Sequence, residues 1–157
     1  MVARHTGRLS AILGAPGWLA RALSYMAMTA PLDVLAKAPY MLLVTFRKDG
    51  TPVPTPVWTV RIGTELWVWT SPTAGKVKRI RRDAHVQVSP CTRTGGQIGD
   101  LVDATARIGG DAETSLVLGA LVEKYGFQAR ITQLPNLVNR LLRKPPRPAG
   151  TLAISMP

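Results

Sequence analysis

The chain has 157 residues, the length of a single domain, and 46% of them are hydrophobic, enough to bury a core and exclude wholesale disorder. Lysine and arginine total 20 against 9 aspartates and glutamates, a net charge of +11 that favours an anionic partner: a polyanionic cofactor, nucleic acid or an anionic membrane surface. Cys91 is the single cysteine, which excludes an internal disulfide and makes a reducing cytoplasm the expected location. Because there are only two histidines beside it, an ordinary structural zinc site is disfavoured, and we expect no metal.

Residues 1–38 are predicted to form a helical extension that precedes the main domain, residues 39–157. The stretch from Ser10 to Met28 is apolar, but Arg21 lies inside it and glycine and proline interrupt it, so it does not predict a transmembrane span. Its bulky residues would share one helical face: Trp18, Leu19, Leu23 and Met26. Such a helix would pack on the body of the protein or on a partner subunit. The alternative is an interfacial helix in peripheral contact with a membrane, which would make the protein membrane-associated.

The main domain is predicted to be mainly β, because runs rich in β-branched and aromatic residues alternate with turn residues. We expect strands at Met41–Lys48, Pro52–Ile62, Leu66–Thr70, Ala84–Pro90, Leu101–Ile108 and Thr151–Met156. Asp49 and Gly50 predict a hairpin between the first two. Two helices are expected, at Ala112–Tyr125 and Leu134–Arg143. Five or six short strands with few helices indicate a small antiparallel β-barrel with flanking helices.

Three prolines set the second predicted strand apart. Pro52, Pro54 and Pro56 have no backbone N–H and would delete donors from the hydrogen-bond ladder. This strand is therefore expected to lie at an edge, or to carry irregular backbone where something else docks.

The segment from Trp69 to Arg82 has the composition of an anion-binding site. A strand ends in the hydroxyl residues Thr70 and Ser71, a loop with proline and glycine follows, and a basic helix begins near Gly75. Hydroxyls, free N–H groups at a helix start, a glycine and the Lys76 ammonium are the groups that hold an anion. Val77 and Ile80 are three residues apart and would face the core. The alternative is a solvated basic helix with no ligand.

Four segments, in this order along the chain, resemble the pyridoxamine 5'-phosphate oxidase-like, FMN-binding split β-barrel superfamily. They are Thr45–Val53, Thr55–Trp58, Gly75–Asp83 and Val88–Cys91, with a looser similarity at Lys124-Tyr125-Gly126. More narrowly, they are similar to the actinobacterial branch of oxidoreductases that depend on the deazaflavin coenzyme F-420. The resemblance implies a split β-barrel fold.

The resemblance also implies a homodimer that binds a flavin or deazaflavin in a groove at its interface. The cofactor phosphate would be held by Thr70, Ser71 and Lys76, at the helix that opens with Gly75, and Lys78 and Arg79 would be auxiliary cations. Residues of the proline-rich strand would line the ring: Thr55, Pro56, Val57 and Trp58.

One position departs from the pattern of the family. Many relatives place an arginine shortly before the phosphate lysine, where this chain has Ala74 and Gly75. One anion contact is thus missing or supplied from elsewhere, and this leaves the choice between coenzyme F-420 and FMN open. Coenzyme F-420 carries a phosphodiester and an oligoglutamate tail, and the surplus of lysine and arginine fits this longer polyanion better than the single phosphate of FMN.

The implied function is that of an oxidoreductase that uses reduced coenzyme F-420 to transfer hydride to an unsaturated or quinone-like small molecule. The alternatives are an FMN-dependent oxidoreductase and a non-catalytic carrier of flavin or deazaflavin. Nucleic-acid binding through the basic segments Lys76–Arg82 and Arg140–Arg147 is disfavoured, because neither carries a recognisable motif.

The sequence assigns no catalytic acid or base, because no acid/base pair is evident. Cys91 is expected to be a buried thiol and His85 a surface residue, while Trp67 and Tyr125 are expected to serve in packing.

Overall fold

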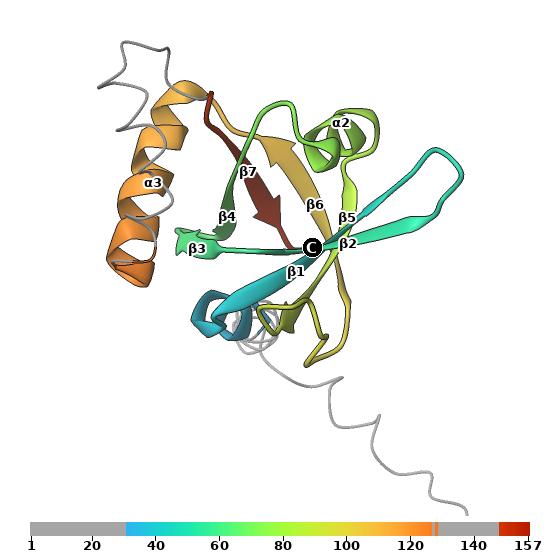
Figure 1. Ribbon diagram of the computed structural model, residues 1–157, viewed down its shortest axis with the longest axis horizontal. Helices are drawn as coiled ribbons and strands as arrows, with labels where there is room; N and C mark the ends of the chain where they lie inside the picture. Colours follow the sequence, from blue (N-terminus) through green and yellow to red (C-terminus); the bar gives the residue numbers. More distant parts are fainter. Residues whose placement is uncertain (1–30, 127, 129–147) are drawn as a thin grey trace, which may run out of the picture.

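The computed structural model describes residues 31–126, 128 and 148–157, and within them seven strands form one curled antiparallel sheet, a half-barrel (Figure 1). The strands are β1 (Tyr40–Phe46), β2 (Pro52–Val57), β3 (Thr59–Ile62), β4 (Glu65–Thr70), β5 (His85–Cys91), β6 (Val102–Ile108) and β7 (Gly150–Ser155). Their order in the sheet is β2-β1-β5-β6-β7-β4-β3. Helices α2 (Gly75–Arg82) and α3 (Asp111–Tyr125) flank it, and residues 31–37 are also helical. The predicted mainly β barrel with flanking helices is therefore confirmed.

One predicted strand was wrong in its extent, and this changes the number of strands. The segment Pro52–Ile62 forms two strands, β2 and β3, because the chain leaves its pairing with β1 after Val57 and begins to pair with β4 at Thr59. Trp58 lies between them, and the two strands form the opposite edges of the sheet. The sheet consequently has seven strands rather than five or six.

Several predictions fall on residues outside those described. These are the helix at Leu134–Arg143, the basic segment Arg140–Arg147 and residues 1–30 of the N-terminal extension. Among the described residues, no helix has the length and hydropathy needed to cross a membrane.

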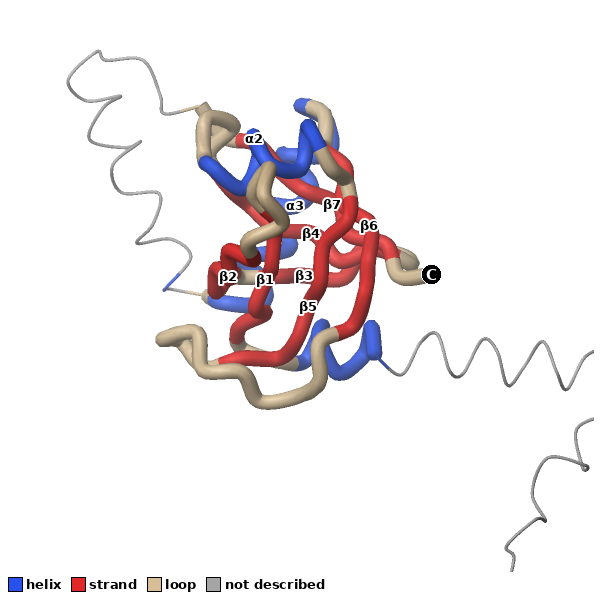
Figure 2. Tube along the Cα trace, turned by 90° about the vertical axis from the view of Figure 1, so that its right-hand side faces the viewer, coloured by secondary structure: helices blue, strands red, loops and turns tan. Residues whose placement is uncertain are grey.

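The concave side of the sheet holds the main core, which two helices close at opposite ends (Figure 2). Val77 and Ile80 of α2 are buried at one end, as their spacing predicted, and Leu32 and Leu35 of the helical residues 31–37 are buried at the other. Helix α3 covers the outer face of β3, β4 and β7 through a second buried cluster that includes Val117. Burial of these side chains fixes α2 against the barrel, so the polar residues of that helix have a defined place.

The prolines of β2 do not delete donors from the β1–β2 ladder, contrary to the prediction. The amide of Arg47 donates to the carbonyl of Thr51 at 2.9 Å, so these two residues form a hydrogen-bonded pair of the antiparallel ladder. Because such pairs alternate with pairs that are not hydrogen-bonded, the next hydrogen-bonded pair is Thr45↔Val53, followed by every second pair along the strands. Pro52, Pro54 and Pro56 alternate with those positions, and their nitrogens face the free edge of the sheet. The edge position was predicted correctly, and the prolines strip donors from that edge alone.

Candidate functional site

A half-buried lysine opens helix α2 beside the end of β4. Lys76 Nζ donates to the Oγ1 of Thr70 at 3.4 Å, and the Thr70 side chain is itself buried. Burial, followed by the nearby charge of Arg79, lowers the pKa of Lys76 from its ordinary value. No carboxylate of the described residues forms an ion pair with this ammonium. A partly desolvated cation whose partner is only a hydroxyl is favourably placed to bind an anion.

A second cation, Arg79, lies against strand β1. Its Nε donates to the Oγ1 of Thr45 at 2.7 Å, and Thr45 is 1% exposed. Burial and then the charges of Arg47 and Arg82 lower the pKa of Arg79. The four basic residues Arg47, Lys76, Arg79 and Arg82, called the cation cluster below, therefore repel one another, and an anion would relieve that repulsion.

The first turn of α2 adds backbone donors to the cation cluster. Ala74 is the N-cap residue and has no side-chain capping bond, and the turn contains no acidic residue. Among the hydrogen bonds of the described residues, none engages the amide of Gly75 or of Lys76. These free N–H groups at the positive end of the helix dipole suit a phosphate oxygen.

Gly75 is the position where the guanidinium of Arg79 folds back over its own helix. A Cβ placed on Gly75 would lie 3.0 Å from Nη1 of Arg79, so the guanidinium would have to shift by a few tenths of an ångström to admit it. A cation from one turn later in the helix thus lies close to the helix start, in contact with Gly75.

The proline-rich strand meets the candidate anion site at its first residues, by way of the sheet register. Its last residue, Val57, pairs with Met41 near the start of β1, so the strand leads away from Thr45 and Arg79. Thr55 pairs with Leu43 and Val53 with Thr45, so all four side chains lie on the face that carries the Thr45 hydroxyl.

The remaining predicted site residues are placed less directly. Pro56 points to the opposite face of β2, Val57 is buried in the core, and Trp58 is half-buried and stacks on Tyr125, with ring centroids 4.9 Å apart. Ser71 is exposed, and its hydroxyl lies 3.0 Å from that of Thr73. Lys78 is exposed, and no contact with the cation cluster is seen in the described part. The structure therefore brings Thr70, Gly75, Lys76 and Arg79 together, and Thr55 lies on the same face of the sheet as the Thr45 hydroxyl.

Sequence reasoning missed Thr45, Arg47 and Arg82 as parts of this site. Arg82 donates to the carbonyl of Phe46, so a second side chain of α2 reaches β1. The available signal was the hydroxyl of Thr45, which interrupts the apolar run of β1. A lone threonine in a buried strand does not reveal which helix will supply its partner, so this pairing needed the tertiary structure.

Two weaker candidates, Cys91 and His85, lie away from the cation cluster. Cys91 is buried, as predicted, and burial raises the pKa of its thiol, so it is not poised as a nucleophile. His85 is exposed, as predicted, and its Nε2 lies 3.0 Å from Oδ1 of Asp103. The described residues contain no group of three or more histidine, cysteine or acidic side chains placed to hold a metal ion.

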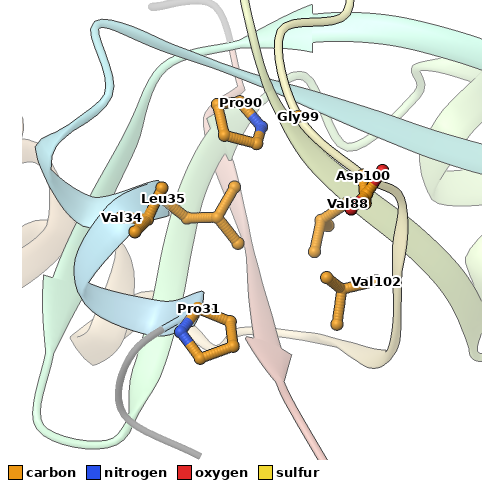
Figure 3. Close-up of a pocket in the computed structure, with 8 residues that line it drawn as sticks. All are labelled: Pro31, Val34, Leu35, Val88, Pro90, Gly99, Asp100 and Val102. Atoms are coloured by element: carbon orange, nitrogen blue, oxygen red, sulfur yellow. The ribbon is translucent and has the colours of Figure 1, made fainter.

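A pocket of about 380 Å³ lies at the other end of the barrel, between the helical residues 31–37 and strands β5 and β6 (Figure 3). Its lining is apolar apart from Asp100: Pro31, Val34, Leu35, Val88, Pro90, Gly99 and Val102. It contains none of the cations described above, so it is separate from the candidate anion site.

Comparisons with known proteins agree with this fold. Residues 30–155 match the model of the family described as pyridoxamine 5'-phosphate oxidase. No curated protein matches the sequence.

Three solved structures illustrate the range of proteins with this architecture. A conserved hypothetical protein from Mycobacterium tuberculosis has 20% sequence identity and a TM-score of 0.54, over 82% of this chain and 79% of its own. The heme storage protein HutZ from Vibrio cholerae has 12% identity and a TM-score of 0.55, over 86% of this chain and 89% of its own. An FAD-binding protein from Mesorhizobium loti has 16% identity and a TM-score of 0.54, over 83% of this chain and 87% of its own. At these identities the likeness establishes the fold alone.

Proposed function

This chain belongs to the pyridoxamine 5'-phosphate oxidase family, and from that premise we propose that it binds a phosphate-bearing flavin or deazaflavin and acts as an oxidoreductase. The observation that carries the proposal is the pair Lys76 and Arg79, two partly desolvated cations that have hydroxyl partners and no carboxylate partner in the described chain. Such a pair gains stability when it binds a phosphate.

The residues at the start of α2 fit a phosphate group. Lys76 and Arg79 would neutralise its charge, the Thr70 hydroxyl and the free amides of Gly75 and Lys76 would donate to its oxygens, and no acidic side chain of the first turn would oppose it. In relatives that place an arginine just before the phosphate lysine, the charge of that arginine would lie close to the proposed phosphate position. Here Arg79, folded back over Gly75, would supply that charge.

Within this proposal we favour coenzyme F-420 over FMN. Arg47 and Arg82 extend the cation cluster past the phosphate position towards the β1–β2 hairpin, and the chain carries a net charge of +11. A ligand with several negative charges would use these outer cations, whereas the single phosphate of FMN would use only Lys76 and Arg79.

When bound and reduced, such a cofactor would supply a hydride to an unsaturated or quinone-like small molecule. The residues of this chain would bind and orient it: the cation cluster at the phosphate, and Thr55 and Trp58 beside the ring. We assign no proton donor: Tyr125 stacks on Trp58, but its hydroxyl is engaged by the backbone of Thr59.

We further propose that the chain forms a homodimer with the cofactor groove at the interface, as in the superfamily that it resembles. Light scattering coupled to gel filtration tests this directly, since a monomer at micromolar concentration would contradict it.

The proposed function is tested by titrating the protein with coenzyme F-420 and, separately, with FMN, while following tryptophan fluorescence. Tighter binding of coenzyme F-420 is expected, and tighter binding of FMN would move the protein to the flavin branch. Binding without oxidation of the reduced cofactor by a panel of quinones and unsaturated acceptors would identify a carrier. Binding of neither cofactor would refute the proposal.

A further inference from the structure

The C-terminal end of α3 occupies the free edge of β3. The backbone N–H of Thr59 donates to the Tyr125 hydroxyl at 3.2 Å, and that hydroxyl donates to the Thr59 carbonyl, also at 3.2 Å. One phenol group thus satisfies both backbone groups that a neighbouring strand would otherwise pair. The first residue of β3 is held by a side chain at the position where the sheet ends.

Lys124 reinforces the same corner from the adjacent position. Its ammonium donates to the Thr59 carbonyl at 2.8 Å and to the Ala38 carbonyl at 3.1 Å. Ala38 lies two residues before β1, so this single side chain ties the entry to β1 to the start of β3. The ammonium also lies 4.9 Å from the centre of the Tyr125 ring, in cation–π contact.

Trp58 joins this arrangement through its ring. It is the residue between β2 and β3, and its indole stacks on Tyr125 with an interplanar angle of 16°. The residue that follows it is the one whose backbone Lys124 and Tyr125 hold. Both the backbone direction after Trp58 and the plane of its indole are therefore set by α3.

We infer that Lys124 and Tyr125 are positioning residues for the bend at Trp58, and that they place Trp58 and Thr55 of the preceding strand at the proposed ring position. The part that concerns a bound ring rests on the proposed function, because it requires the ring to lie against Trp58. Neither residue touches the cation cluster among the described contacts, so their effect would be on the ring end of the ligand and not on its phosphate end.

The test uses the full chain with three substitutions: Tyr125→Phe, which removes the hydroxyl and keeps the stack, Tyr125→Leu, which removes both, and Lys124→Met. Lys48→Met, in the exposed β1–β2 turn, is the matched control. Two NMR signals report the corner without any ligand: the exchange rate of the Thr59 amide and the shift of the Trp58 indole N–H, identified with Trp58→Phe. Ligand readouts are the affinities for coenzyme F-420, for FMN, for riboflavin, which has the ring without the phosphate, and for inorganic phosphate.

Tyr125→Phe is expected to speed exchange of the Thr59 amide by about tenfold, because its hydrogen bond is lost. Tyr125→Leu is expected to shift the Trp58 indole signal as well. Both variants, and Lys124→Met, should weaken the ring-bearing ligands by about three- to tenfold and leave inorganic phosphate unchanged. A merely structural defect would weaken binding of inorganic phosphate too, whereas Lys48→Met should leave both NMR signals and the affinity for riboflavin, which has no phosphate, unchanged.

Unchanged Thr59 and Trp58 signals in both Tyr125 variants would overturn the inference. The inference would also be overturned if the Thr59 and Trp58 signals changed while the affinity for every ring-bearing ligand that the wild-type protein binds stayed the same. If the wild-type protein binds no ring-bearing ligand, the proposed function fails, and the two NMR signals then decide by themselves whether Lys124 and Tyr125 hold the bend.

Discussion

Arg79 donates from Nε to the buried hydroxyl of Thr45 at 2.7 Å, and this bond joins helix α2 to strand β1 across 34 positions of the chain. It anchors the guanidinium at one nitrogen and leaves the others to reach back over Gly75. An arginine held in this way loses less side-chain entropy when an anion binds, because its position is already restricted.

Thr45→Val is expected to release Arg79 from this anchor. The loss should weaken cofactor binding by about 1 kcal/mol, the typical net contribution of one hydrogen bond, while Thr45→Ser, which keeps the hydroxyl, should bind normally. Titration of the three proteins with the same cofactor measures the difference. Equal affinities would mean that the anchor has no part in binding.

Lys76→Ala is expected to weaken binding of the cofactor by about 1.5–3 kcal/mol, the range for a charge-assisted hydrogen bond. Lys78→Ala removes the same charge from the exposed side of the same helix and should cost less. The two dissociation constants, measured at one salt concentration, check this. If Lys76→Ala binds as tightly as the wild type, the phosphate lies elsewhere.

The lowered pKa of Lys76 predicts a pH-dependent stability with an unusual sign. A lysine whose pKa is lower in the folded than in the unfolded state lowers the free energy of unfolding while it is charged in both states. This loss of stability becomes smaller as the pH rises from the pKa of the folded state towards the ordinary value of 10.5. Lys76→Met should therefore raise the free energy of unfolding of the ligand-free protein at neutral pH. Urea unfolding of both proteins should show the gap closing near pH 10.5.

Cofactor binding should follow the opposite course with pH. A bound phosphate favours the charged form of Lys76, so affinity should decline as the pH rises through the lowered pKa of that lysine. The dependence should be absent in Lys76→Met. A decline of equal size in both proteins would assign it to another group.

Gly75→Ala is expected to separate stability from binding. Gly75 begins a helix, and alanine there favours the folded state by up to about 1 kcal/mol. The added Cβ would lie 3.0 Å from Nη1 of Arg79 and shift the flexible guanidinium by a few tenths of an ångström from its place at the helix start. The melting temperature should be unchanged or higher while the affinity for the cofactor falls, and unchanged affinity would show that Arg79 does not reach the ligand.

The free edge of β2 should be prone to pairing once its prolines are replaced. Pro54→Thr together with Pro56→Thr gives that edge two N–H donors that a second chain could use. Concentration-dependent association is expected in light scattering, beyond the oligomer formed by the wild type. Leu116→Thr, an exposed substitution on α3, is the control and should not associate further.

The sequence determined the class of fold and the main parts of the candidate site. Alternation of apolar residues, the Asp49-Gly50 turn and the spacing of Val77 and Ile80 are local signals, and they predicted the hairpin, the buried face of α2 and every strand but Pro52–Ile62 correctly. The start of the basic helix at Gly75 was predicted on the same ground. Such features depend on residues that are neighbours along the chain, so the chain displays them directly.

Only the tertiary structure decided which distant groups meet. The division of Pro52–Ile62 at Trp58 follows from a change of partner, from β1 to β4, and no local pattern encodes a partner. The bonds from Arg79 to Thr45 and from Tyr125 to Thr59 join residues 34 and 66 positions apart. They form because packing of α2 and α3 on the barrel brings these side chains within hydrogen-bond distance, and burial then makes it costly to leave a polar group without a partner.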